Sequence, residues 1–180
     1  MNNLFRVAVL TVVASAVPVL AAPVADPSPT APSLVALAGY APLSGEGVVV
    51  ILSDRKVLSF KGKTGTTPGL VHDYDVLTVV NELRSAGAEG ISVGGVRLTN
   101  QSGIRCVGPQ ILVGKVPIAI PVRIEAVGNA ALLSAHLKIK GGVADGFKVQ
   151  GPRAQVQSTS KLRLDAAPLP AHLDAARTTD

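Results

Sequence analysis

The chain has 180 residues, a formal net charge of +5 at pH 7 and 47% hydrophobic residues, which points to one domain with appended segments and a sizeable core. Aromatic residues make up only 3% of the chain and tryptophan is absent, so the chain is short of the aromatic side chains on which bases or sugars stack. The cations are scattered rather than gathered into a dense stripe. This pattern excludes nucleic acid as a partner and is compatible with association with an anionic membrane surface.

The N-terminal part is typical of an exported protein. An uncharged apolar run at 7–20 follows a short polar start, and Val19 and Ala21 fit the −3 and −1 positions of a signal-peptidase site. We predict a signal peptide at 1–21, with an uncleaved N-terminal anchor as the alternative, and a linker rich in Pro, Ala and Ser at 22–33. Both alternatives place the following domain outside the cytoplasm: secreted, periplasmic or anchored to the outer face of the cytoplasmic membrane.

Residues 34–165 are predicted to form a single domain, followed by a flexible tail at 166–180. The first predicted element is a short apolar strand at 45–54, bounded by turn residues. The next stretch, 57–71, is expected to be a loop in which "VLSF" pairs at most briefly.

The sequence "HDYDVLTVVNELRSAGA" predicts an amphipathic helix. Val76, Val80 and Leu83 recur at the i, i+4, i+7 spacing that puts apolar side chains on one helical face. Asp73 or Asp75 is expected to be the N-cap of this helix.

The following stretch, "AGAEGISVGGVRL", contains four glycines. They come after a helix and before a strand, whereas a loop that binds a dinucleotide phosphate needs them between a strand and a helix. Gly87 is therefore expected to end the helix, and Gly94-Gly95 to form the two-residue turn of a β-hairpin. A second hairpin turn is predicted at Gly114-Lys115 in the apolar segment "QILVGKVPIAIPV", which is either a core hairpin or an edge that faces a partner.

The second half of the domain repeats the alternation. A strand is predicted at 121–128, then a helix that begins after Asn129 with Leu132, Leu133 and Leu137 on one face, and then strands at "FKVQ" and "AQVQSTSKLRL". This order predicts an α+β, ferredoxin-like split βαβ (βαββαβ) sandwich. Its sheet would be mostly antiparallel, with two helices on one face and inserted β-hairpins.

The best candidate site is "HDYD" at 72–75. His72, Asp73 and Asp75 have the chemistry to hold a metal or move a proton, but carboxylates at a helix start more simply cap free N–H groups. Arg97 and Arg105 complete the candidate contacts for a ligand or partner. We predict no catalytic residue set, no metal and no cofactor, because zinc would need further ligands and no HExxH, CxxC or nucleophile-elbow motif occurs.

The chain has a single cysteine, Cys106, which excludes an internal disulfide. It lies in the apolar stretch "GIRCVGPQILV". Because free cysteine is among the residue types most often buried, Cys106 is expected to pack in the core rather than to act as a nucleophile.

Three stretches resemble a bacterial family known as domain of unknown function 881. They are "LAGYAPLSGEGVVVILSD", "VHDYDVLTVVNELRSAGAEGISVGGVRLTNQSGIRCVGPQILVGKVPI" and "RIEAVGNAALLSAHLKIKGGV", and the middle one is the most specific. The resemblance spans about residues 34–165. It implies an exported or membrane-anchored protein, often encoded near envelope and cell-division functions, with no established catalytic residues. Family members often carry a coiled coil ahead of the domain, where this chain has its Pro-rich linker.

Two functions remain open at this point. The first is a non-enzymatic binding or scaffold module of the bacterial cell envelope, acting in cell division or wall synthesis. Its partner would be another envelope protein or a cell-wall component, bound by β-augmentation at the hairpins or an edge strand. The alternative is a small-molecule-binding protein or hydrolase with a site around His72, Asp73 and Asp75, which would need a pocket that joins these groups and perturbed pKa values. The sequence does not specify the oligomeric state.

Overall fold

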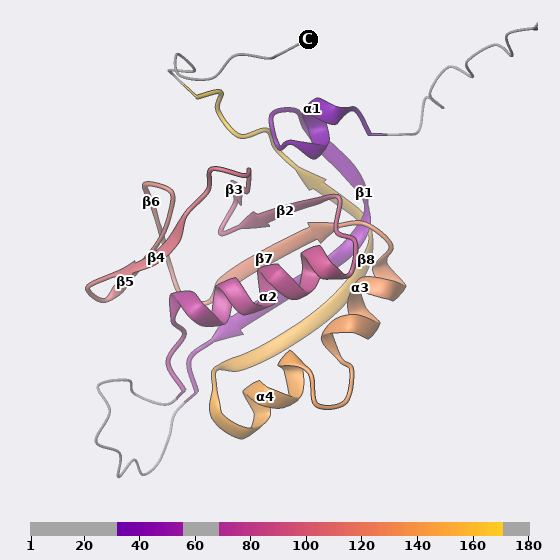
Figure 1. The fold of residues 1–180 in the computed structure, drawn as a ribbon. Coiled ribbons are helices and arrows are strands. Elements are labelled where there is room, and N and C mark those ends of the chain that lie inside the picture. The colour runs from indigo at the N-terminus through magenta and orange to yellow at the C-terminus, as the bar shows by residue number, and fades with distance from the viewer. Residues whose placement is uncertain (1–31, 56–68, 171–180) are drawn as a thin grey trace, which may run out of the picture. The chain divides into compact units, whose positions relative to one another are not determined.

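The computed structural model describes residues 32–55 and 69–170, and Figure 1 shows their arrangement. The larger of two sheets has five strands in the order β3-β2-β7-β1-β8, with every neighbouring pair antiparallel. These strands are β1 (Leu43–Ser53), β2 (Gly90–Val93), β3 (Val96–Arg97), β7 (Val122–Val127) and β8 (Arg153–Leu164). The protein is therefore a mixed α+β protein with antiparallel sheets.

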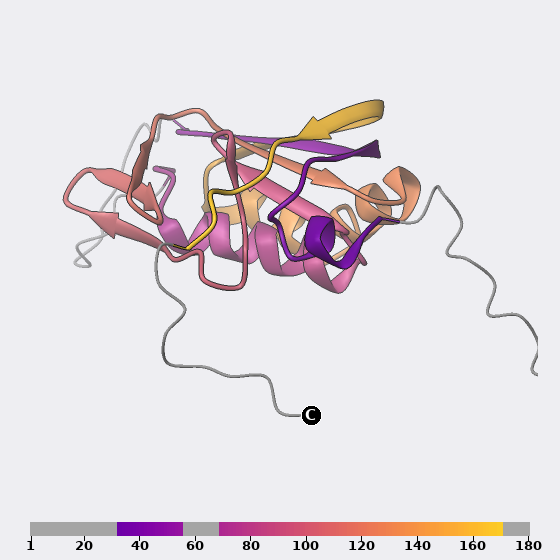
Figure 2. The same ribbon diagram turned by 90° about the horizontal axis from the view of Figure 1, so that it is seen from above.

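Three helices lie together on one face of this main sheet, as Figure 2 shows for α2, α3 and α4. The helices in the described ranges are α1 (Leu34–Leu37), α2 (Asp73–Ser85), α3 (Ala130–Leu137) and α4 (Val143–Gln150). In α2, Val76 and Leu83 are fully buried and Val80 is 1% exposed, so the predicted apolar stripe is confirmed. The short helix α1, capped by the Ser33 side chain, was not predicted.

The helix predicted after Asn129 is confirmed as α3. The Asn129 side chain accepts a hydrogen bond from the N–H of Leu132 at 3.0 Å, as expected of an N-cap. The predicted apolar face is only partly right, because Leu133 and Leu137 are buried but Leu132 is 61% exposed. Successive helical residues are rotated by about 100°, so Leu132 and Leu133 point in different directions.

The segment "FKVQ", predicted to be a strand, forms the C-terminal half of α4. The helix buries Phe147, while Val149, which a strand would have placed on the same face, is 84% exposed. The first turn is stabilised by Asp145, which accepts from the N–H of Gly141 at 3.0 Å and pairs with Lys148 at 2.8 Å. Four alternating residues were too few to separate the strand period from the helical one.

The strands predicted at 45–54 and 154–164 are confirmed as β1 and β8, with small changes at their ends. The register between them shifts between Gly45 and Gly47, which puts a β-bulge in the edge strand β8. The main core fills the space between this sheet and the helices.

A second sheet has three antiparallel strands in the order β4-β5-β6. They are β4 (Ile104–Val107), β5 (Gln110–Val113) and β6 (Val116–Ile118). We call it the small sheet. It lies beside the N-terminal end of α2 in Figure 1, and its Ile111, Val113 and Ile118 belong to the main core. The segment "QILVGKVPIAIPV" is therefore in part a core hairpin.

Both predicted hairpin turns are confirmed. Gly94 and Gly95 have φ values of 57° and 81° and connect β2 to β3, while Gly114, with a φ of 61°, connects β5 to β6. These positive φ values explain why glycine occupies the turns.

Several predictions fall outside the described residues. They concern the signal peptide or anchor and most of the linker, the brief pairing of "VLSF", and the end of the C-terminal tail. Within 32–55 and 69–170, no helix has the length and apolar character needed to cross a membrane.

Candidate functional site

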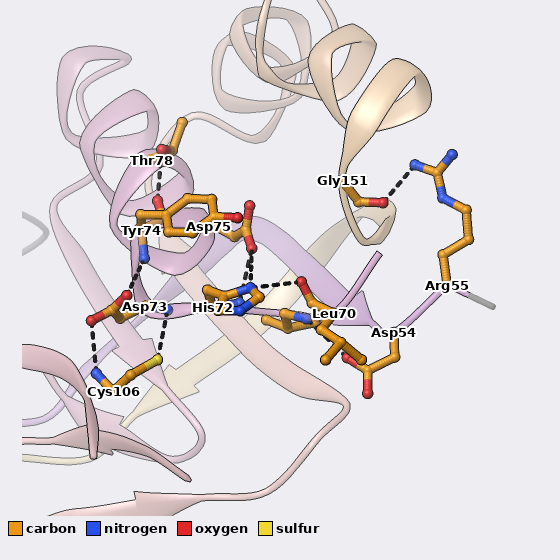
Figure 3. Close-up of polar contacts among 11 residues, drawn as sticks. Asp54, Arg55, Leu70, His72, Asp73, Tyr74, Asp75, Thr78, Cys106 and Gly151 are labelled. Carbon is orange, nitrogen blue, oxygen red and sulfur yellow. Dashed lines mark hydrogen bonds and ion pairs between the residues drawn. The ribbon is translucent and has the colours of Figure 1, made fainter. Parts of the chain in front are cut away.

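The "HDYD" segment forms the start of α2, and Figure 3 shows how its side chains are arranged. The N-cap is His72, so the expectation of Asp73 or Asp75 at that position was wrong. Asp75 lies three residues further on and its carboxylate accepts from the backbone N–H of His72 at 2.8 Å. The carboxylate thus satisfies a free donor at the helix start, as the capping interpretation required.

Asp75 is only 3% exposed. Burial raises the pKa of its carboxyl, and the nearby Asp73 adds to the rise, while the hydrogen bond from His72 and the charge of His72 lower the pKa. A buried carboxyl with a raised pKa is one feature of a general acid or base. Here its position is explained by its role in the helix cap.

Asp73 joins α2 to the small sheet. Its Oδ2 accepts from the backbone N–H of Cys106 at 2.7 Å, and its own N–H donates to the Cys106 Sγ at 3.4 Å, as drawn in Figure 3. The Asp73 carboxylate therefore accepts a hydrogen bond from the Cys106 N–H, which points away from the small sheet at the free edge of β4. This contact fixes the small sheet against the start of the helix.

Cys106 is exposed, so the prediction of a buried cysteine was wrong. The residue lies on β4, the outer strand of the small sheet, and local apolar sequence did not reveal that this strand is an edge. Burial raises the pKa of the thiol, as do the charges of Asp73 and Asp75, although the hydrogen bond with the Asp73 backbone lowers it. A raised pKa keeps the thiol protonated at neutral pH, which disfavours a nucleophilic role.

The His72 ring has three close neighbours, one of which is the Asp75 carboxylate, with its Oδ2 3.9 Å from Nδ1. Its Nδ1 lies 3.0 Å from the carbonyl oxygen of Leu70, and the ring stacks on Tyr74 with centroids 5.3 Å apart. Burial raises the pKa of the Tyr74 hydroxyl, with further contributions from the charges of Asp75, Asp73 and Cys106. In the part of the chain that the structure describes, no group of three or more His, Cys, Asp and Glu residues is placed to hold a metal.

The two candidate arginines differ in their surroundings, because Arg97 is buried and Arg105 is exposed. Arg97 is 4% exposed, and its guanidinium donates to the carbonyl oxygens of Ala36 at 2.6 Å, Ala41 at 3.3 Å and Asp165 at 3.4 Å. It is therefore an internal anchor rather than an accessible contact. Arg105 is exposed on β4 and, because side chains alternate along a strand, it projects from the face opposite to that of Cys106.

A cavity in another part of the domain is remote from the "HDYD" segment. It has a volume of about 680 Å³ and lies between α1, the C-terminal end of α2, the start of β2 and the loop at 98–102. Its charged lining residues are Arg84 and Glu89, and Tyr40 contributes a hydroxyl. None of the five predicted site residues lines it, and no sequence motif pointed to this cavity.

The fold and these contacts define an α+β domain in which the polar cluster at the start of α2 stabilises the helix and fixes the small sheet. The sequence model of the family described as bacterial protein of unknown function (DUF881) matches residues 31–177, and the chain belongs to this family. The resemblance inferred from the sequence is thus confirmed.

Two similar proteins of known sequence are named as UPF0749 proteins. The chain is 36% identical over 107 residues to the UPF0749 protein YlxW of Bacillus subtilis, covering 59% of this chain and 46% of that protein. It is 29% identical over 138 residues to the UPF0749 protein Rv1825 of Mycobacterium tuberculosis, covering 74% of this chain and 43% of that protein. The chain thus spans less than half the length of these relatives.

A solved structure has a similar fold. It is the crystal structure of an uncharacterized conserved protein from Mycobacterium tuberculosis, with a TM-score of 0.63 and 28% sequence identity. The match covers 81% of this chain and 96% of that chain.

Proposed function

We propose that this protein is a non-enzymatic binding module of the bacterial cell envelope, working outside the cytoplasm, and that the small sheet is its recognition surface. The proposal is carried by the outer face of that sheet, which we define as Arg105, Val107, Gln110, Leu112 and Pro117. Arg105, Leu112 and Pro117 lie side by side across the three strands, and Val107 is 50% exposed. Apolar side chains grouped beside a cation on a solvent-facing sheet are a feature of interaction surfaces.

The charge of the small sheet indicates the class of partner that it binds. The sequence contains no acidic residue between Glu89 and Glu125, whereas Arg105 and Lys115 are exposed within this stretch. The surface therefore combines apolar and cationic groups. It suits an apolar segment of an envelope protein that is flanked by acidic residues.

The strand edges favour side-chain contact over β-augmentation. The Cys106 N–H on the outer edge of β4 is already bound by Asp73, and Pro117 in β6 has no N–H to donate. Both edges are therefore poor templates for an added strand. A hollow of about 430 Å³ beside Pro117 and Ile120 instead offers space for a side chain of the partner.

The test is site-specific photo-crosslinking in cells with the full chain. A crosslinker at Val107 is expected to give a discrete adduct with an envelope protein, and the same group at Leu132, which is 61% exposed on α3, is the control. Arg105→Glu should abolish the Val107 adduct by reversing the charge, while Arg163→Glu on β8 should leave it unchanged. An adduct that persists with Arg105→Glu, or that forms equally from Leu132, would refute the proposal.

The alternative function, a small-molecule site or hydrolase at His72, Asp73 and Asp75, has weaker support. The two carboxylates already accept hydrogen bonds from backbone N–H groups, and the cavities that we identified are lined by other residues. His72→Ala with an unchanged cellular phenotype would count against this alternative.

The strand order also supports a finer assignment of the fold. The order β2-β7-β1-β8, with α2 between β1 and β2 and with α3 and α4 between β7 and β8, is compatible with a ferredoxin-like split βαβ arrangement. In this assignment β3 and the small sheet are the inserted hairpins.

A further inference from the structure

A cavity of about 300 Å³ lies at the C-terminal end of α4, on a different part of the domain from the small sheet. Three of its lining residues are cations: Arg55, which follows β1, Lys148 in α4 and Arg153 at the start of β8. Phe147 and Ala144 provide an apolar wall. No acidic residue lines this cavity, so it combines positive charge with an apolar surface.

Arg55 is held in place before any ligand arrives. Its guanidinium donates to the carbonyl oxygens of Phe147, of Lys148 at 3.0 Å and of Gly151 at 2.6 Å, and Figure 3 shows the side chain directed at Gly151. These carbonyls accept hydrogen bonds but leave the full positive charge of the arginine. A cation fixed in this way loses little conformational entropy on binding an anion.

The positive charge of the cavity is only partly neutralised. Lys148 pairs with Asp145, the only acidic residue in the sequence between Glu125 and Asp165. Among residues 32–55 and 69–170, neither Arg55 nor Arg153 forms an ion pair with a carboxylate. The cavity therefore keeps a net positive charge.

Further cations and exposed apolar side chains lie on the connection from α3 to α4 and on α4 itself. Lys138 and Lys140 flank Ile139, which is 58% exposed, and Val149 in α4 is 84% exposed. Cations next to protruding aliphatic side chains are typical of surfaces that contact the interface of an anionic bilayer.

We propose that this cavity binds the phosphate group of an anionic phospholipid, with Arg55, Lys148 and Arg153 as its ligands. Guanidinium groups recognise phosphate oxygens through paired hydrogen bonds, and the apolar wall at Phe147 faces the part of the lipid next to the headgroup. Val149, which follows Lys148 in α4 and is 84% exposed, then contacts the bilayer surface. This site is independent of the small sheet, so the domain binds a membrane and a protein partner at separate places.

The test is flotation of the full chain with vesicles of phosphatidylcholine that contain phosphatidylglycerol, compared with vesicles of phosphatidylcholine alone. The variant is Lys148→Gln with Arg153→Gln, which retains Arg55 and its hydrogen bonds to α4. The matched control is Lys161→Gln with Arg163→Gln, which removes the same charge from the exposed far end of β8. Every protein has the same N-terminal segment, so the difference between the variants reports on the cavity.

Each cation at an anionic bilayer contributes about a fivefold gain in binding, so the double variant should bind phosphatidylglycerol vesicles roughly thirtyfold more weakly. The control should change by less than about threefold, because its charges lie outside the cavity. Equal losses in the two variants, or binding that does not depend on phosphatidylglycerol, would overturn the proposal. Circular dichroism establishes that both variants are folded.

A second arm separates the lipid from soluble phosphate. Inorganic phosphate is titrated into the wild-type chain and the Lys148→Gln, Arg153→Gln variant, and the thermal midpoint is followed. A rise in the wild-type midpoint that the variant lacks, together with loss of vesicle binding in the variant, supports a phospholipid ligand. The same rise with unchanged vesicle binding would show that the cavity takes a soluble phosphate and would overturn the lipid assignment.

Discussion

The Arg97 side chain shows how one buried residue connects distant parts of the chain. Its guanidinium binds carbonyl groups of Ala36 and Ala41 at the beginning of the domain and of Asp165 near its end. Burial lowers the pKa of Arg97, and its Nε has no hydrogen-bond partner within the described ranges. A Cβ atom at Gly90 would lie 2.7 Å from the guanidinium, so glycine at that position makes room for it.

Replacing Arg97 with methionine should therefore destabilise the domain. Arg97→Met fills a similar volume but removes the guanidinium that donates to three carbonyl groups, and we expect the free energy of unfolding to fall by about 3 kcal/mol. Urea denaturation followed by circular dichroism measures this change. The control is Arg123→Met, because Arg123 is 52% exposed in its pair with Glu125 and its loss should cost about 1 kcal/mol or less. Equal effects of the two substitutions would contradict the role of Arg97.

Asp75 gives a prediction about pH. Burial raises the pKa of this carboxyl in the folded protein, so between its unfolded and folded pKa values the folded state binds more protons. Its contribution to stability is then greatest below the unfolded pKa, near 3.8, and is lost as the pH rises through the folded pKa. Asp75→Asn does not titrate and still offers an oxygen to the His72 N–H. The stability of Asp75→Asn relative to the wild type should therefore rise from pH 3 to pH 7 in urea denaturation, and a fall would contradict the raised pKa.

At the scale of secondary-structure elements, the turn between β2 and β3 touches the small sheet. A Cβ atom at Gly94 would lie 2.6 Å from Cγ2 of Ile118 in β6. Gly95 has a similar positive φ, but a Cβ atom there would meet nothing within 4 Å. The close contact at Gly94 is thus a point where the two sheets are packed together.

These two glycines form a matched pair for mutation. Gly95→Ala should cost about 1 kcal/mol, the strain of an alanine with positive φ. Gly94→Ala carries the same strain and also displaces Ile118 from the core, so we expect a loss of about 2–3 kcal/mol. Thermal unfolding of both variants measures the difference. If Gly94→Ala is no less stable than Gly95→Ala, the two sheets are not held together at this contact.

Local sequence predicts well those helices in which the apolar pattern repeats over several turns or a side chain caps the first turn. The stripe of Val76, Val80 and Leu83 predicts α2 correctly, and Asn129 predicts the start of α3. The first turn of α4 depends on Asp145 and on burial of Phe147, which four alternating residues do not reveal. The N-cap at His72 was missed because Asp75 supports it from three residues further along the helix.

At the scale of the whole molecule, the sequence predicted a mixed α+β domain, the family and the hairpin turns, because these depend on order and local pattern. It did not predict that β4, β5 and β6 form a separate sheet, since that depends on packing against α2. It also did not predict the cationic cavity. Arg55 meets the end of α4 across more than 90 residues of sequence, and no local spacing marks such a meeting.

The hydrogen bond from the Ala167 N–H to the Gly39 carbonyl oxygen, 2.8 Å long, has a consequence for how the domain can be joined to other polypeptides. It joins the loop after α1 to the segment after β8, but the described chain ends at residues 32 and 170, which lie apart in Figures 1 and 2. A circular permutation that links these ends and reopens the turn at Gly108 therefore needs a linker long enough to bridge their separation.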